Sequence, residues 1–223
     1  MTEQKKAKKQ LPVWQESILL VATAMVMAVI VKTFFLQAFY IPSASMEPTM
    51  LVNDKILVQK VSYWGGGDVK RGDIVVFDDP GGWLTEEDSK HASNPIQKAL
   101  ETVGLFPTGG HLIKRVIGVG GDTIECCTDG KLTINGKQIT EPYVLDETAT
   151  KDKPFKVVVP KGHLWVMGDN RGNSSDSRVH QGDPGGGFIA EDSVVGKAWL
   201  RVWPLGRAGF IHKPDTFDAD LNP

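Results

Sequence analysis

Two serines stand between two prolines in the segment Pro42–Pro48. Proline fixes φ and lacks a backbone donor, so the flanking prolines stiffen this segment and hold its side chains in place. A serine hydroxyl is a weak nucleophile, and it attacks a carbonyl only when an adjacent base removes its proton. Ser45 is therefore a candidate nucleophile, provided that another part of the chain supplies the base.

The usual base beside a catalytic serine is histidine. None of the histidines in the chain lies in a Gly-x-Ser-x-Gly motif or beside an obvious partner acid. They are His91, His111, His163, His180 and His212. Lone histidines are more often surface or packed residues than catalytic ones. The search for a base therefore turns to lysine.

Lys114 lies in an apolar run that is typical of a strand. By strand alternation it shares a face with Leu112 and Val116, whereas Arg115 faces the other way. An ammonium group has an unperturbed pKa of about 10.4, and desolvation must remove its charge before it can accept a proton. Most lysines are solvated, but one on an apolar strand face is a candidate general base.

A third polar segment, Gly168–Arg178, could be a surface loop or a calcium loop. The calcium interpretation fails on spacing, because Arg171 falls at the third position and no glycine stands at the sixth. A polar surface loop is the simple interpretation that remains.

The elements that must position these residues begin with an apolar span near the N-terminus. Crossing a bilayer as a helix takes about 20 apolar residues, and we predict a transmembrane anchor over 14–36. The lysine-rich start predicts a cytoplasmic basic tail over 1–13 and a long extracytoplasmic domain. A cleaved secretory signal peptide is the alternative interpretation, although the prolines after the span disfavour it.

After the span, β-rich runs recur between glycine and proline turns, which is typical of an all-β barrel or sandwich. The runs are Lys55–Val61, Gly72–Phe77, His111–Val119, Lys131–Asn135, Phe155–Val159, His163–Met167 and Val194–Trp203. Between them, 78–110 is polar and rich in glycine and proline, so we predict an insertion with one short helix over 95–103. The last residues predict a polar, frayed tail over 213–223.

Composition limits the function classes. A hydrophobic content of 41% suits a folded domain, and a net charge of −2 gives no basic surface for nucleic acid. The two cysteines, Cys126 and Cys127, are adjacent, which is closer than the usual disulfide range. We expect two packed or exposed thiols rather than a strained vicinal disulfide. The chain shows no zinc-ligand spacing, and we expect neither a metal nor a cofactor.

Four motifs, in order along the chain, resemble those of the type I signal peptidases, the Ser-Lys membrane proteases that cut secretory signal peptides. They are Ile41–Thr49 after the anchor, Arg71–Phe77, Ile113–Gly118 with Gly121-Asp122, and Met167–Arg171 continuing to Arg178. Each motif alone is weak, but four in order make the resemblance specific. It covers most of the chain, except the segment between the second and third motifs.

The resemblance implies a role for each matching residue. Ser45 would be the nucleophile and Lys114 the general base. Ser43 would help to form the oxyanion hole with the backbone N–H of Ser45. The supporting residues implied by the match are Ser174, which would position the lysine, and Asp176 with Arg178, which would form an ion pair.

The family cuts after small residues in an Ala-x-Ala pattern, so the resemblance also implies a substrate site. A substrate strand would pair near Ile41–Ser45 or near Leu112–Lys114. Residues expected to contact the substrate are Ile41, Pro42, Met46 and Ile113. Ser175 stands where the family often has alanine and Met50 where it often has leucine, so both could tune the pocket and leave the mechanism intact.

The implied fold is mainly β. A signal-peptidase-like catalytic core over 37–212 would carry a smaller inserted β lobe around 123–165, with one transmembrane helix before it. We expect a monomer in the plasma membrane with its N-terminus in the cytoplasm. The expected partners are membrane lipid and the signal peptides of exported preproteins, and no nucleic acid.

Three rival functions fit parts of the sequence. A self-cleaving Ser-Lys repressor of related fold would carry an N-terminal DNA-binding domain in place of the membrane span. The endoplasmic-reticulum type of signal peptidase subunit uses histidine where this chain has Lys114. A non-enzymatic, membrane-anchored β module would leave the paired Ser45 and Lys114 motifs as a coincidence.

Overall fold

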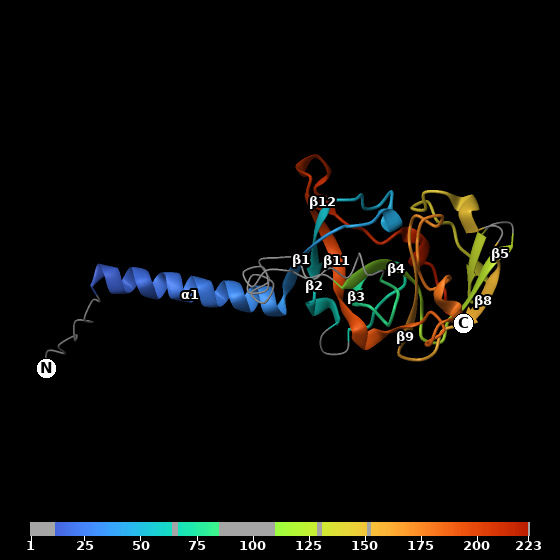
Figure 1. The fold of residues 1–223 in the computed structure, drawn as a ribbon, viewed down its shortest axis with the longest axis horizontal. Helices are drawn as coiled ribbons and strands as arrows, with labels where there is room; N and C mark the ends of the chain where they lie inside the picture. The colour runs from blue at the N-terminus through green and yellow to red at the C-terminus, as the bar shows by residue number, and fades with distance from the viewer. Residues whose placement is uncertain (1–11, 64–66, 85–109, 129–130, 151–152, 223) are drawn as a thin grey trace, which may run out of the picture.

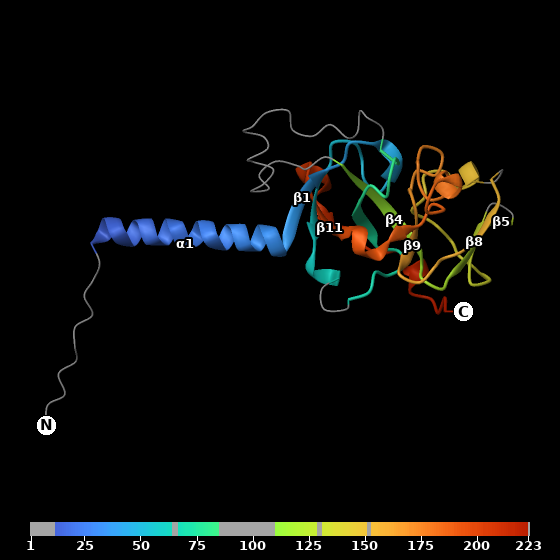
Figure 2. The same ribbon diagram turned by 60° about the horizontal axis from the view of Figure 1, so that its bottom comes forward.

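The computed structural model describes residues 12–63, 67–84, 110–128, 131–150 and 153–222. Its first element is the helix α1 (Val13–Phe34), which projects away from a body of β-strands in both ribbon views (Figure 1, Figure 2). Within it, Val13–Val31 is long and apolar enough to cross a membrane by length and composition. The helix covers most of the predicted anchor, but Leu36 already begins a strand.

Eight strands of the described residues form one antiparallel sheet, in the order β1-β2-β11-β3-β4-β9-β10, with β12 beside β11. Their bounds are β1 Leu36–Tyr40, β2 Lys55–Gln59, β3 Ile74–Asp78, β4 His111–Val119, β9 His163–Met167, β10 Ile189–Ala190, β11 Val194–Trp203 and β12 Gly209–Phe210. The mainly β class predicted from the sequence is confirmed.

A second antiparallel sheet, in the order β7-β6-β5-β8, lies at the end of the body away from α1 (Figure 1). Its strands are β5 Thr123–Thr128, β6 Lys131–Ile134, β7 Lys137–Gln138 and β8 Phe155–Val158. Asn135 and Gly136 make the tight turn between β6 and β7, both with positive φ, as an Asn-Gly hairpin requires. This sheet lies within the predicted lobe over 123–165, whereas β9 at its end belongs to the main sheet.

Single turns of 3₁₀-helix join the strands, at Ala44–Met46, Val61–Tyr63, Glu147–Thr150, His180–Gly182, Glu191–Ser193, Leu205–Arg207 and Asp215–Phe217. The first of these carries the candidate nucleophile. The predicted helix over 95–103 and most of the predicted insertion lie outside the described residues.

Strand β11 lies between β2 and β3 and so connects two halves of the main sheet. One half is the β1–β2 pair, whose connecting loop holds Ser45, and the other is the β3–β4 pair, which holds Lys114. Lys197 of β11 and Lys114 of β4 both lie opposite Val75, one on each side of β3. A strand from the end of the chain therefore sets the spacing between the two halves.

Alternate residues of β3 pack into different cores, as the period of a strand requires. Ile74 and Val76 join Ile56, Val58, Met46 and Met50 in a core beneath the nucleophile loop. Val75 and Phe77 join Val116, Leu164 and Val166 on the other face. Both faces of the central strands are therefore buried, and the backbone around Lys114 is held on both sides.

The last residues of the chain pack onto the fold, so the expectation of a frayed tail is wrong for them. Phe217 and Leu221 are buried in a third core with Trp165 and the strands of the second sheet. Asn135 Nδ2 donates to the Leu221 carbonyl at 2.7 Å. Two apolar side chains in a polar segment are enough to anchor it when a core lies within reach.

The two adjacent cysteines of β5 are joined in a disulfide, contrary to the expectation of two thiols. The pairing of β5 with β6 shifts register between Glu125 and Thr128. Strict strand alternation, which would send neighbouring side chains to opposite faces, does not hold across such a bulge. Cys126 is buried in the third core, and Cys127 packs against the same core.

Candidate active site

Ser45 lies in the 3₁₀ turn Ala44–Met46 and is buried, with 6% of its surface exposed. Backbone hydrogen bonds hold both ends of its loop: Ile41 N–H donates to the Asp54 carbonyl at 2.9 Å, and Met50 N–H donates to the Met46 carbonyl at 2.9 Å. The side chains of Met46 and Met50 are fully buried beneath the turn. The loop is therefore a rigid platform for the serine.

Lys114 lies in the middle of β4 and is also buried, with 4% exposed. Its Nζ donates a hydrogen bond of 2.7 Å to Ser45 Oγ. Ser43 Oγ lies 3.3 Å from Ser45 Oγ, on the same loop. The structure therefore brings together the three polar residues that the sequence marked separately.

Asn170, in the loop after β9, binds the backbone of the nucleophile turn. Its N–H donates to the Ser45 carbonyl at 3.0 Å, and its Nδ2 donates to the Ala44 carbonyl at 3.1 Å. Sequence reasoning left this residue out of the site, although the motif Met167–Arg171 contains it. These two hydrogen bonds fix the direction in which the Ser45 peptide points.

Gly168 lets the loop after β9 come close to the nucleophile. A methyl group on its Cα would lie 2.4 Å from the Ser45 carbonyl oxygen and 2.3 Å from Ser174 Oγ. Such distances are far below van der Waals contact, and the nearest backbone atom is the nucleophile's own. Gly168 is therefore the close-approach position that places Ser174 beside the turn of Ser45.

Asp176 and Arg178 form the ion pair that the resemblance implied. Arg178 Nε donates to Asp176 Oδ1 at 2.8 Å and Nη2 donates to Oδ2 at 2.8 Å. Burial opposes ionisation of Asp176, but the Arg178 guanidinium, the Gly168 N–H and the Ser174 hydroxyl together lower the pKa of its carboxyl. The carboxylate thus ties the start and the end of the Gly168–Arg178 loop together.

A second buried ion pair lies on the opposite face of β4 from Lys114. Arg115 Nε and Nη2 donate to the two carboxylate oxygens of Asp169 at 2.8 and 2.6 Å, and both side chains are almost fully buried. The Arg115 guanidinium also lies over the ring of Tyr143, 4.2 Å from its centroid. Thr49 donates to Asp169 Oδ2 at 2.5 Å. Sequence alternation indicated the direction of Arg115 but not this partner.

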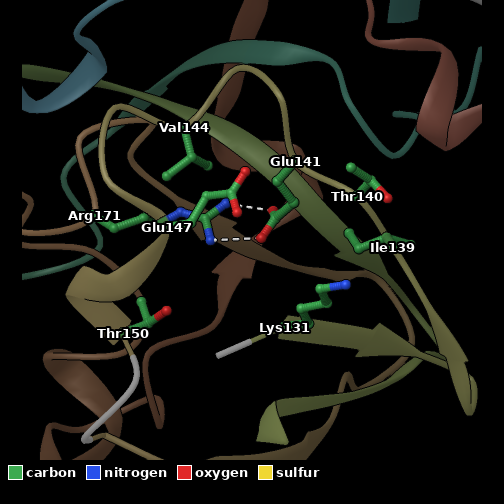
Figure 3. Close-up of a pocket in the computed structure, with 8 residues that line it drawn as sticks. All are labelled: Lys131, Ile139, Thr140, Glu141, Val144, Glu147, Thr150 and Arg171. Carbon is green, nitrogen blue, oxygen red and sulfur yellow. Dashed lines mark hydrogen bonds and ion pairs between the residues drawn. The ribbon is translucent and has the colours of Figure 1, made fainter. Parts of the chain in front are cut away.

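A third ion pair lines a small hollow of about 30 Å³ beside the second sheet (Figure 3). Arg171 donates to both Glu141 carboxylate oxygens, at 2.9 and 2.5 Å. Burial opposes ionisation of Glu141, but the charge and hydrogen bonds of Arg171 lower its pKa. With its guanidinium and carboxylate already paired, this hollow is a structural site and leaves little room for a ligand.

The candidate substrate pocket is a cleft of about 250 Å³ that opens at Ser45 and Lys114. Its lining residues are Pro42, Ser43, Ser45, Trp83, Leu84, His111, Leu112, Ile113, Lys114, Asn173 and Ser175. Pro42 and Ile113 are among them, as the resemblance implied. Ile41 and Met46 lie in the core behind the nucleophile loop, at 1% and 0% exposure, and do not line this cleft.

The acidic and histidine side chains of the described residues form no group of three or more that could hold a metal ion. Among the polar residues that line the pocket, Ser45 and Lys114 are hydrogen-bonded to each other. This arrangement suits nucleophilic attack on a carbonyl by a serine whose proton goes to an amine.

Comparisons with known proteins find relatives over most of the chain. The family described as "Signal peptidase, peptidase S26" matches residues 14–203. A "Probable signal peptidase I" of Mycobacterium leprae is 39% identical over 92% of this chain and 81% of its own length. "Signal peptidase I" of Mycobacterium tuberculosis is 38% identical over 88% and 75%. "Signal peptidase I U" of Bacillus subtilis is 33% identical over 86% and 89%.

Among solved structures, the crystal structure of a signal peptidase I from Enterococcus faecalis is 26% identical, covering 58% of this chain and 96% of its own, with a TM-score of 0.37. The family match extends from the membrane-span helix to the end of β11. The chain therefore belongs to the signal peptidase family, peptidase S26.

Proposed function

We propose that this protein is a membrane-bound serine endopeptidase that removes N-terminal signal peptides from secreted preproteins and cuts after small residues, in an Ala-x-Ala pattern. The observation that carries the proposal is the buried hydrogen bond of 2.7 Å between Lys114 and Ser45, at the wall of a cleft. Membership of the signal peptidase family supports the same reaction.

Burial makes a lysine suitable as the base, because removing an ammonium from water disfavours its charged form. Neutral Lys114 takes the Ser45 proton while Oγ forms a bond to the scissile carbonyl carbon, whose π electrons move to the oxygen. The lysine then gives the proton to the leaving amine as the C–N bond breaks. Water hydrolyses the acyl-enzyme by the same route and frees Ser45.

The oxyanion would be stabilised by the Ser45 N–H and the Ser43 hydroxyl. Ser43 Oγ lies 3.3 Å from the attacking oxygen, so its hydroxyl could turn toward the substrate carbonyl oxygen, on which the negative charge develops. A donor of this kind is worth about 10²–10³-fold in rate in related acyl transfers. Asp176 and Arg178 act one step further away, by holding the loop that Gly168 packs against Ser45. Ser174, whose Oγ lies beside Gly168, would position Lys114, which is the role that the family motif implies.

Strand β4 forms one wall of the cleft beside the candidate nucleophile. An extended peptide lying along this wall would place its small side chains in the cleft. Leu112 and Ile113 line that cleft and restrict the size of the side chains that fit.

The N-terminus of this proposed enzyme lies in the cytoplasm, because lysines at positions 5, 6, 8 and 9 precede the candidate span and basic residues favour the cytoplasmic side. A cysteine introduced at the exposed Asn222 should then react, in intact cells, with a thiol reagent that cannot cross membranes. The unaltered chain is the control for reaction at Cys126 and Cys127. Labelling only after cell lysis would show that Asn222 lies in the cytoplasm and would contradict this topology.

The catalytic proposal is tested with the purified full chain in detergent and a preprotein with an Ala-x-Ala site. We expect cleavage after the second alanine by the wild type and none detectable by Ser45→Ala, because no hydroxyl remains to attack the carbonyl. Ser193→Ala is the matched control, since this hydroxyl lies outside the cleft and binds only the Ala190 carbonyl in the described structure. Cleavage by Ser45→Ala at the wild-type rate would disprove the proposal.

A further inference from the structure

Ser175, which lines the cleft beside Ser45, is the first member of a three-residue hydrogen-bonded chain. Its Oγ lies 2.8 Å from His180 Nε2, and His180 Nδ1 lies 2.6 Å from Asp183 Oδ2. The histidine is buried, with 8% exposed, while Ser175 is exposed to the cleft. None of these three residues has a role in the mechanism described above.

The imidazole of His180 is held in place by Trp83, another residue that lines the cleft. The two rings are stacked, with centroids 4.2 Å apart and planes 10° from parallel. Trp83 is itself fixed by the edge of Phe77 and by Asp79, whose carboxylate accepts four backbone N–H groups of the Asp79–Leu84 turn. Burial opposes ionisation of Asp79, but these donors lower the pKa of its carboxyl.

This arrangement determines which way the Ser175 hydroxyl can point. We assign to His180 the tautomer with its proton on Nδ1, because a carboxylate only accepts hydrogen bonds and Asp183 Oδ2 lies 2.6 Å from Nδ1. Nε2 then carries a lone pair and accepts the Ser175 proton. With that proton turned toward the histidine, the lone pairs of Ser175 Oγ face the cleft, so Ser175 is an acceptor and not a donor toward a bound peptide.

We propose that Ser175, oriented by His180 and Asp183, is a specificity-determining residue that raises the acceptance of serine, relative to alanine, at one of the small positions before the cleaved bond. Serine is the small side chain that can donate a hydrogen bond to this acceptor, while alanine leaves it without one. The inference rests on the proposed function and adds a preference among its substrates. His180 and Asp183 are positioning residues in this scheme.

The test compares matched preproteins in which alanine or serine stands at the first or the third position before the cleaved bond. The quantity measured is the ratio of kcat/KM for the serine substrate to that for the alanine substrate. We expect Ser175→Ala to lower this ratio about three- to tenfold at one of the two positions, the size of one hydrogen bond. Ser175→Thr keeps the hydroxyl and should keep most of the ratio.

His180→Phe tests the positioning role, because it retains an aromatic ring against Trp83 but cannot accept the Ser175 proton. The released hydroxyl rotates, so the ratio should fall to a value between those of the wild type and Ser175→Ala. Ser193→Ala is the matched control, since this hydroxyl lies outside the cleft and donates to the Ala190 carbonyl. Its ratio should equal that of the wild type.

The outcomes separate this inference from the proposed function. If the wild type cleaves neither member of a pair, or Ser45→Ala cleaves both, the proposed function fails. If Ser45-dependent cleavage is normal but Ser175→Ala keeps the wild-type ratio at both positions, only the specificity role fails. An equal change in Ser193→Ala, or a Ser175→Thr ratio as low as that of Ser175→Ala, also overturns it.

Discussion

Lys114→Met is expected to lower kcat for preprotein cleavage by at least about 10⁴-fold, to the same level as Ser45→Ala. The lysine is the group that accepts the Ser45 proton, and methionine has no base at that position. Methionine is unbranched and of similar length, so it should fill the buried slot that Lys114 occupies at 4% exposure. The loss should therefore lie in the chemical step rather than in folding.

Two further variants make this experiment decisive. Lys197→Met removes a lysine that also lies opposite Val75, on the other side of β3, and that pairs with Asp73. It tests for a general loss of stability, and its kcat should stay within about tenfold of the wild type. The double variant Ser45→Ala with Lys114→Met should be no slower than either single variant, because residues that act as a unit are not additive. Retained cleavage in Lys114→Met would exclude lysine as the base.

Asp169→Asn is expected to lower the free energy of unfolding by about 3–5 kcal/mol. The substitution keeps the shape of the side chain but leaves the Arg115 guanidinium, 1% exposed, without its opposite charge. Guanidine or urea unfolding followed by tryptophan fluorescence measures the change. The effect should be large because water cannot reach the guanidinium to replace the lost partner.

The matched control for Asp169→Asn is Glu125→Gln, which removes the charge from an exposed pair. Glu125 and Lys156 lie 3.0 Å apart with side chains 46% and 65% exposed, so this change should cost about 0–1 kcal/mol. Adding Arg115→Met to Asp169→Asn should recover part of the loss, because the unpaired charge is then removed. Equal costs for Asp169→Asn and Glu125→Gln would show that the buried pair is not important for stability.

Ser45 and Lys114, the proposed catalytic pair, could be recognised from the sequence because each has an unusual local sequence context. Ser45 stands between prolines, and Lys114 interrupts an apolar strand. The contact between Ser45 and Lys114 could not be derived from these local contexts, because 69 residues separate the two and the order of strands in the sheet decides whether they meet. The resemblance to the family motifs predicted that Ser45 and Lys114 act together, and strand periodicity alone would not have predicted it.

The ion pairs of Arg115 with Asp169 and of Arg171 with Glu141 were harder to predict. Asp169 follows Arg115 by 54 residues, and nothing local distinguishes this carboxylate from the many that are solvated. His180 was treated as a lone histidine, because Ser175 and Asp183 become its neighbours only through the turn at His180–Gly182. Side-chain partners across loops depend on loop geometry, which hydrophobic periodicity does not encode.

The short strands were predicted least well. No strand is predicted at β1, and its first residue, Leu36, falls within the predicted anchor, because periodicity alone does not separate a short strand from the end of a helix. The tail was expected to fray because its composition is polar, but Phe217 and Leu221 reach a core formed by the second sheet. Both errors arise where tertiary packing overrides local composition.

The position of β11 between β2 and β3 also bears on the order in which the protein is made. Ribosomes deliver the chain from its N-terminus, so Ser45 and then Lys114 appear long before Val194–Trp203. Until β11 inserts between β2 and β3, Ser45 and Lys114 lie on two separate strand pairs, β1–β2 and β3–β4, and no strand fixes the distance between them. Because of this order of synthesis, the active site can form only after nearly the whole domain has been synthesised.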